Sequence, residues 1–140
     1  PVVEEPWAVP YDNGRGSQVN EMIEVSLKKG IAQMGNVAGL VAGLMQEDYE
    51  LIGRSMVDYI IEPVRSILIP HFFDVKNAAI QEGALGCSIS GAGPSIFAFS
   101  KGEETARRVA QAMQHVFTPS GIHTNVFVSR INQNGPKILD

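Results

Sequence analysis

The segment SGAGPS, residues 90–95, has the residue types best suited to chemistry in this sequence. Glycines between hydroxyl side chains let successive backbone N–H groups face one anion, as in phosphate- and carboxylate-binding loops. The standard nucleotide signatures do not match, because no lysine completes a Walker loop and Ile96 stands where a dinucleotide fingerprint needs glycine. Two interpretations therefore stay open from the residues alone: an anion-binding loop, or a strand connection that only requires positive φ.

The segment EPVR, residues 62–65, is the second candidate. Pro63 breaks or restarts a helix there, so Arg65 follows a bend that could direct it into a cleft. Its planar guanidinium has the geometry that binds a carboxylate. The competing interpretation is a surface ion pair between Glu62 and Arg65, three residues apart on one helical turn.

Few other side chains suit catalysis. Cys87 stands inside an apolar run, which favours an inert core thiol over a reactive one. His71, His115 and His123 show no metal-ligand spacing with one another or with Cys87. No nucleophile with a matching base and acid can be assembled by spacing, so the sequence predicts neither a catalytic nor a metal-ligating residue.

The helices that must position these segments are indicated by apolar residues at three- and four-residue spacing. The first is expected from Ser26, its N-cap, to about residue 46, and the second over residues 48–61, where Pro63 ends it. A third is expected from Pro70 to a glycine cap at residue 83. Glycines 35, 39 and 43 share one face of the first helix, so another helix, or else a ligand, must approach it closely.

Short apolar runs at residues 84–89 and 95–100 predict two strands joined by the glycine-rich segment, followed by a helix over 103–117 and a strand over 123–131. This order predicts an α+β sandwich with a mainly antiparallel sheet. Residues 1–25, rich in prolines and turn signals, are expected to form an arm or linker. The first two helices carry more apolar surface than three short strands can cover, so an exposed apolar patch is expected.

Composition limits the classes of function. A chain of 140 residues with 44% hydrophobic residues is typical of one globular domain. A net charge of −4 argues against nucleic acid as a partner, and no apolar run is long enough to predict a membrane span. The single cysteine gives no internal disulfide, so a cytoplasmic location is expected.

Two segments, which stand at the expected distance from each other along the chain, resemble motifs of one protein family. Residues 83–98, GALGCSISGAGPSIFA, resemble the third sequence motif of the GHMP kinases, which phosphorylate galactose, homoserine, mevalonate and phosphomevalonate. Residues 61–70, IEPVRSILIP, resemble the Glu-Pro-x-Arg segment of the homoserine kinase branch. The resemblance runs over residues 26–131 and includes GNVAGL at residues 35–40.

This resemblance implies that residues 26–140 form the C-terminal domain of a kinase that transfers the ATP γ-phosphoryl group, with Mg²⁺, to the hydroxyl of L-homoserine. The product would be O-phospho-L-homoserine, in threonine biosynthesis. The implied fold is a ferredoxin-like sandwich with about four strands. The family's ATP-binding loop and magnesium ligands belong to an N-terminal domain that these residues do not contain, so this chain alone is expected to be inactive.

The resemblance also implies a substrate site. Arg65 would clamp the substrate carboxylate, and Ser90, Gly91, Ala92 and Gly93 would border the substrate through backbone N–H groups, since phosphoryl transfer mainly needs positioning and charge neutralisation. The family's Thr-x-x-x-Arg segment before the first helix has no match here: Ser17 and Glu21 stand nearby, and a glutamate would repel a carboxylate. Residues 1–25 therefore contribute no site residue.

Two alternatives stay open. A GHMP kinase for another small alcohol is expected if Arg65 turns outward into an ion pair with Glu62. A non-catalytic amino-acid-binding module is the other, since ferredoxin-like domains often sense amino acids. The oligomeric state, a homodimer included, also stays open.

Overall fold

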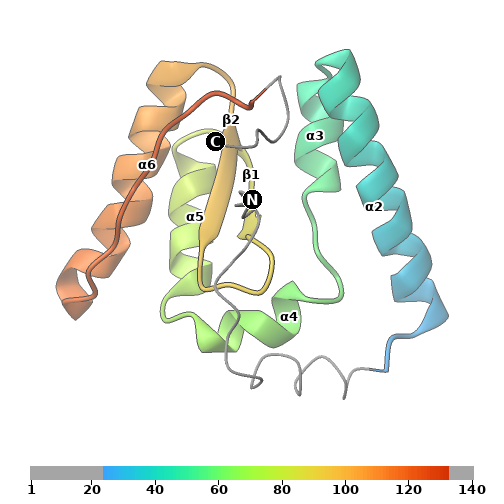
Figure 1. The fold of residues 1–140 in the computed structure, drawn as a ribbon, viewed down its shortest axis with the longest axis horizontal. Helices are drawn as coiled ribbons and strands as arrows, with labels where there is room; N and C mark the ends of the chain where they lie inside the picture. The colour runs from blue at the N-terminus through green and yellow to red at the C-terminus, as the bar shows by residue number, and fades with distance from the viewer. Residues whose placement is uncertain (1–23, 133–140) are drawn as a thin grey trace, which may run out of the picture.

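The computed structural model describes residues 24–132 of the chain. Figure 1 shows the order of its elements, which are α2 (Leu27–Gln46), α3 (Tyr49–Ser55), α4 (Glu62–Arg65), a 3₁₀ turn (Ser66–Leu68), α5 (Phe72–Gln81), β1 (Ala84–Ile89), β2 (Ile96–Ser100), α6 (Glu103–Phe117) and a second 3₁₀ turn (Thr118–Ser120). Strands β1 and β2 pair antiparallel, with Cys87 opposite Ala98. The predicted α+β class with an antiparallel sheet is confirmed.

The hairpin of β1 and β2 lies between two groups of helices. Helices α5 and α6 lie on one side, and α3 with α2 lies on the other (Figure 1). One core cluster joins α5, β1 and α6 through Ala79, Ala84, Cys87 and Val109. A second cluster, Ile69, Phe72 and Ile89, packs at the end of the hairpin where the glycine-rich segment turns. The predicted arm at residues 1–25 lies almost entirely outside the described residues.

Helix α2 packs closely on α3, as its glycines predict. Ser26 caps the helix by accepting a hydrogen bond from the backbone N–H of Lys29 at 3.4 Å. A Cβ atom at Gly39 would lie 2.5 Å from Ser55 Oγ, and one at Gly43 would lie 3.0 Å from the backbone nitrogen of Ile52. Gly35 has no such neighbour within 4 Å. The close approach is therefore to another helix, and only at the second and third of the three glycines.

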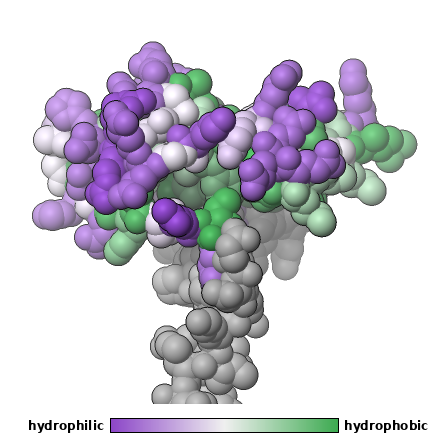
Figure 2. Space-filling model, turned by 90° about the horizontal axis from the view of Figure 1, so that it is seen from above, coloured by the Kyte–Doolittle hydropathy of each residue, from purple (hydrophilic) through white to green (hydrophobic). Residues whose placement is uncertain are grey.

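The opposite face of α2 is exposed and apolar. Leu27, Ile31, Met34, Val41 and Met45 recur at helical spacing and form what we call the α2 apolar face, of which Met34 is 73% exposed. Figure 2 shows hydrophobic side chains at the edge of the molecule that α2 forms. The expected apolar patch is confirmed. No helix among residues 24–132 is both long enough and apolar enough to cross a bilayer.

The predicted helix over residues 48–61 is wrong in its second half, because α3 ends at Ser55. The carboxylate of Asp58 accepts hydrogen bonds from the backbone N–H groups of Ile60 at 2.8 Å, Ile61 at 2.8 Å and Glu62 at 3.1 Å. An aspartate that binds the amides following it offers the chain an alternative to a continuous helix. The chain therefore turns at Asp58 and restarts as α4.

The predicted strand over residues 123–131 is also wrong, since the described residues 122–132 contain no strand. This segment follows α6 instead: Gln114 Nε2 donates to the backbone oxygen of Thr124 at 3.5 Å. Figure 1 shows this segment running along α6. The hydrogen bond and charge of Arg107 lower the pKa of Glu103 at the start of α6, and the charge of Arg130 has a smaller effect in the same direction. A strand needs a sheet edge to pair with. Because the segment lies along a helix, the described sheet keeps two strands.

Candidate functional site

The structure brings Arg65 and the glycine-rich segment together. Arg65 is the last residue of α4 and is only 4% exposed. Its Nη1 donates a hydrogen bond to the backbone oxygen of Ala92 at 3.0 Å. The two segments singled out by residue type, 27 positions apart in the chain, thus share one place in the fold.

The glycine-rich segment forms a tight turn that closes the hairpin. The N–H of Ser90 donates to the Ser95 oxygen at 2.8 Å, and the N–H of Gly93 donates to the Ser90 oxygen at 3.0 Å. Gly93 has φ +80°, and a Cβ atom there would lie 3.3 Å from both Ile69 and Ile89, so the position favours glycine. The peptide bond from Gly93 to Pro94 is cis. The amides of Ser90 and Gly93 therefore serve the turn itself, while Gly91 and Ala92 are exposed at its tip.

Glu62 is not in a surface ion pair with Arg65, so that interpretation is wrong. Glu62 is 8% exposed. Its Oε1 and Oε2 accept hydrogen bonds from Lys76 Nζ at 2.6 and 2.8 Å, and Oε2 also accepts one from Ser88 Oγ at 3.0 Å. We call these three side chains the Glu62 network. It turns the carboxylate towards α5 and β1, whereas Arg65 turns to the loop.

Sequence reasoning missed Lys76 and Ser88. Lys76 follows the core residue Val75 on α5, and Ser88 is a buried hydroxyl within the apolar strand β1. A buried serine in such a strand needs a hydrogen-bond partner, which is the one signal that could have indicated a polar cluster. The identity of that partner depends on how α4, α5 and β1 pack, and local spacing does not contain it.

Cys87 is the inert core thiol that the sequence predicts. Its side chain is fully buried, and burial raises its pKa from 9.0 to about 11. A thiol held in the neutral form is neither a nucleophile nor a metal ligand. Over residues 24–132, no group of His, Cys, Asp and Glu side chains could hold a metal ion.

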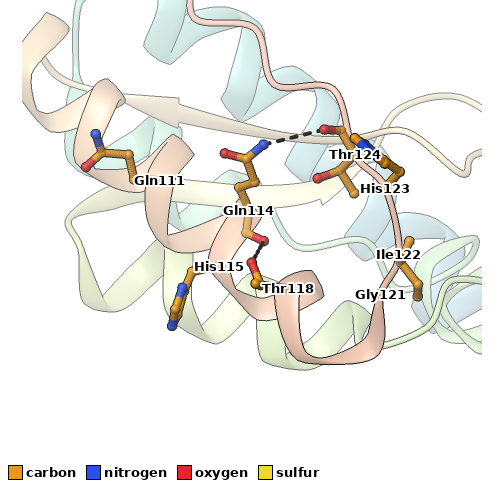
Figure 3. A pocket seen from close by; sticks show the side chains of 8 residues that line it. All are labelled: Gln111, Gln114, His115, Thr118, Gly121, Ile122, His123 and Thr124. Carbon is orange, nitrogen blue, oxygen red and sulfur yellow. Dashed lines mark hydrogen bonds between the residues drawn. The ribbon is translucent and has the colours of Figure 1, made fainter.

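A shallow depression lies elsewhere, at the C-terminal end of α6 (Figure 3). Gln111, Gln114, His115 and Thr118 line it from the helix and its end, and residues 121–124 line it from the chain that follows. None of the candidate residues contributes to it. The contact of Arg65 with the loop, and not this depression, therefore defines the candidate site.

Known proteins match this chain over a range that includes residues 62–65 and 90–95. The family model described as "GHMP kinases C terminal" matches residues 40–118. The homoserine kinase of Chlorobium phaeobacteroides strain BS1 is 51% identical over 117 residues, which are 82% of this chain and 37% of that protein. The homoserine kinase of Xylella fastidiosa strain M12 is 37% identical over 109 residues, 78% of this chain and 34% of that protein.

A solved structure shows a similar fold. The crystal structure of homoserine kinase from Cytophaga hutchinsonii ATCC 33406 matches with a TM-score of 0.84 and 50% sequence identity, covering 94% of this chain and 42% of that one. The chain thus spans little more than a third of the length of the curated relatives quoted above, at 37% and 34%.

Proposed function

This chain belongs to the GHMP kinase family, and from that premise we propose that it forms the C-terminal domain of a homoserine kinase. The complete enzyme would transfer the γ-phosphoryl group of ATP to the hydroxyl of L-homoserine, a step of threonine biosynthesis in the cytoplasm. The observation that carries the proposal is the hydrogen bond from Arg65 to Ala92, which unites the two family segments in one site. Relatives that are 51% and 52% identical over 117 matched residues and are named homoserine kinases support it.

In this proposal Arg65 holds the substrate carboxylate, and Ser90, Gly91, Ala92 and Gly93 border the substrate. A guanidinium binds a carboxylate through two parallel N–H bonds, which fixes orientation as well as charge. Gly91, exposed at the tip of the turn, leaves room for the substrate to approach the backbone. ATP and Mg²⁺ would be bound mainly by an N-terminal domain, so this chain would supply positioning and no catalytic base.

An Arg65 turned outward into an ion pair with Glu62 was expected to favour a kinase for another small alcohol. The burial of Arg65 and the bonds from Lys76 to Glu62 favour homoserine instead. The module that only senses amino acids finds no support, since the relatives described above are named as kinases.

The exposed α2 apolar face supports the proposal that another domain packs against this one. Its side chains point away from α3 and have no cover within the described residues, although burying each one stabilises a fold by roughly 1.5 to 3 kcal/mol. The relatives are nearly three times as long as the matched segment, which covers 37% of the first of them. We therefore assign the face to the rest of the kinase polypeptide, the N-terminal domain. We also expect the sheet of this C-terminal domain to have about four strands when the protein is complete.

The test is ADP release by the full reading frame that encodes this chain, with L-homoserine, mevalonate and galactose offered separately. We expect activity with homoserine alone. Arg65→Ala should lower kcat/KM for homoserine by about 30-fold to several thousand-fold, as expected for about 2 to 5 kcal/mol lost from a buried charge contact. Arg107→Ala, at an exposed arginine of α6, is the matched control and should stay within about two-fold of wild type.

Two results would contradict the proposal. Turnover of mevalonate or galactose in place of homoserine would remove the substrate. Homoserine turnover that Arg65→Ala and Arg107→Ala affect equally would leave the reaction standing and remove Arg65 from the site.

A further inference from the structure

Helix α4 is too short to hold Arg65 in place by itself. It has four residues, and an isolated turn of helix is unstable in water. Its first residue, Glu62, is fastened to α5 and β1 through Lys76 and Ser88, and its last residue, Arg65, is fastened to the loop through Ala92. The position of the guanidinium therefore depends on both attachments.

The Glu62 carboxylate also competes with the glycine-rich segment for the guanidinium of Arg65. Carboxylate and guanidinium three residues apart on one turn attract each other. Both side chains are buried, where a charge that has lost its partner seeks another strongly. Lys76 Nζ on α5, within 2.8 Å of both carboxylate oxygens, neutralises Glu62. As long as this pair holds, Arg65 remains directed to the loop.

We propose that Lys76, with Ser88, is a positioning residue of the substrate site: it occupies the Glu62 carboxylate and so keeps Arg65 on the glycine-rich segment, where it can receive a substrate carboxylate. This inference rests on the proposed function. Lys76 does not touch the substrate. Without it, Glu62 recruits Arg65 and also repels an incoming carboxylate.

The experiment uses the full reading frame and separates KM from kcat. Lys76→Met should raise KM for L-homoserine roughly ten-fold or more, because Lys76 and Arg65 are coupled through Glu62. KM for ATP should stay within about two-fold, because ATP would be bound mainly by the N-terminal domain and not by Arg65. Lys76→Arg should stay close to wild type. The double variant Lys76→Met with Glu62→Gln should return KM most of the way, since no carboxylate remains to capture Arg65. Arg107→Met, which breaks an exposed ion pair on α6, is the control and should change neither constant.

The KM for L-homoserine of the double variant distinguishes a positioning role of Lys76 from a purely structural one. If Lys76→Met raises KM and adding Glu62→Gln raises it further, the network is only a support of the fold and the inference is overturned. The same follows if Lys76→Met leaves KM unchanged. If Lys76→Met does not fold, Ser88→Ala removes one bond to Glu62 and should raise homoserine KM by at least about two-fold. No rise in that variant would overturn the inference.

Hydrogen exchange separates this inference from the proposed function. When Arg65 leaves Ala92, the amides of Ser90 and Gly93 should exchange faster in Lys76→Met than in wild type, and the amides of α6 should not change. This holds even if the wild type turns out to phosphorylate another alcohol. Unchanged exchange at the turn would overturn the inference, whatever the substrate is.

Discussion

Asp58 decides where the Glu-Pro-x-Arg turn begins, and replacing it should loosen that turn in a graded way. Its carboxylate accepts three backbone N–H groups: Oδ1 accepts from Ile60 and Ile61, and Oδ2 accepts from Glu62. Asp58→Ala removes all three acceptors. Asp58→Asn keeps one side-chain oxygen, which can still serve Ile60 and Ile61, and loses only the bond to Glu62.

The expected magnitudes follow from capping energetics. Replacing a helix-capping aspartate by alanine costs about 0.5 to 2 kcal/mol for the one or two amides it usually serves. Because three amides are involved here, Asp58→Ala should cost about 2 kcal/mol, and Asp58→Asn less than about 1 kcal/mol. A loss of about 2 kcal/mol corresponds to roughly 30-fold faster exchange of the amides that open.

The assay is native-state hydrogen exchange at the amides of residues 60–62 in the full-length protein. Asp48→Ala is the matched control, because Asp48 caps α3 through a single amide, that of Leu51 at 2.9 Å, and should affect only α3. If Asp58→Asn accelerated exchange as much as Asp58→Ala, the charge and not the geometry of the acceptors would hold the turn. If neither variant changed it, the explanation of why α3 stops at Ser55 would be refuted.

Two further predictions concern the core and the α2 apolar face. Burial raises the pKa of the Cys87 thiol from 9.0 to about 11 on folding, so stability is unaffected below pH 9 and falls between pH 9 and 11, by about 3 kcal/mol in total. Urea unfolding of wild type and Cys87→Ala from pH 8 to 11 should show this slope in the wild type only, and parallel curves would refute it. Met34→Glu should destabilise the full-length protein by more than about 2 kcal/mol and Lys28→Glu by less than about 0.5 kcal/mol. A harmless Met34→Glu, or a dimer that dissociates in that variant, would show that the N-terminal domain does not cover the face.

The elements whose bounds were predicted well are those whose own sequence decides them. Helix α6 and strand β1 fall at the predicted residues 103–117 and 84–89, because each has a continuous apolar period and a clear boundary. The first helix, α2, also has the predicted bounds for the same reason, with Ser26 as its N-cap. Periodicity is local information, and these elements need no other.

The failures occurred where a single side chain or a distant partner decides the structure. Asp58 interrupts an apolar pattern that would otherwise continue as a helix, and the three backbone hydrogen bonds that its carboxylate accepts outweigh that pattern. The alternation of residues 123–131 suits a strand, but pairing depends on a sheet edge that the described chain does not place beside it.

The candidate site shows the same division. Residue types singled out Arg65 and residues 90–95 separately, and only the family resemblance related them to one substrate. Lys76 has no local signal at all, since its role depends on the packing of α5 against α4 and β1. From residue types alone, a surface ion pair between Glu62 and Arg65 was the simpler interpretation, because spacing along a helix says nothing about which side is buried.

The hydrogen bond between Arg65 and Ala92 ends on a main-chain oxygen, and this has an evolutionary consequence. Any amino acid that adopts the same turn at position 92 supplies the same acceptor, so mutations there need no compensating change at position 65. Across homologues, position 92 should vary without any matching change at Arg65, although the two residues touch. Contact inference from correlated substitutions would overlook this pair, whereas Glu62 and Lys76, which meet through side chains of opposite charge, should change together.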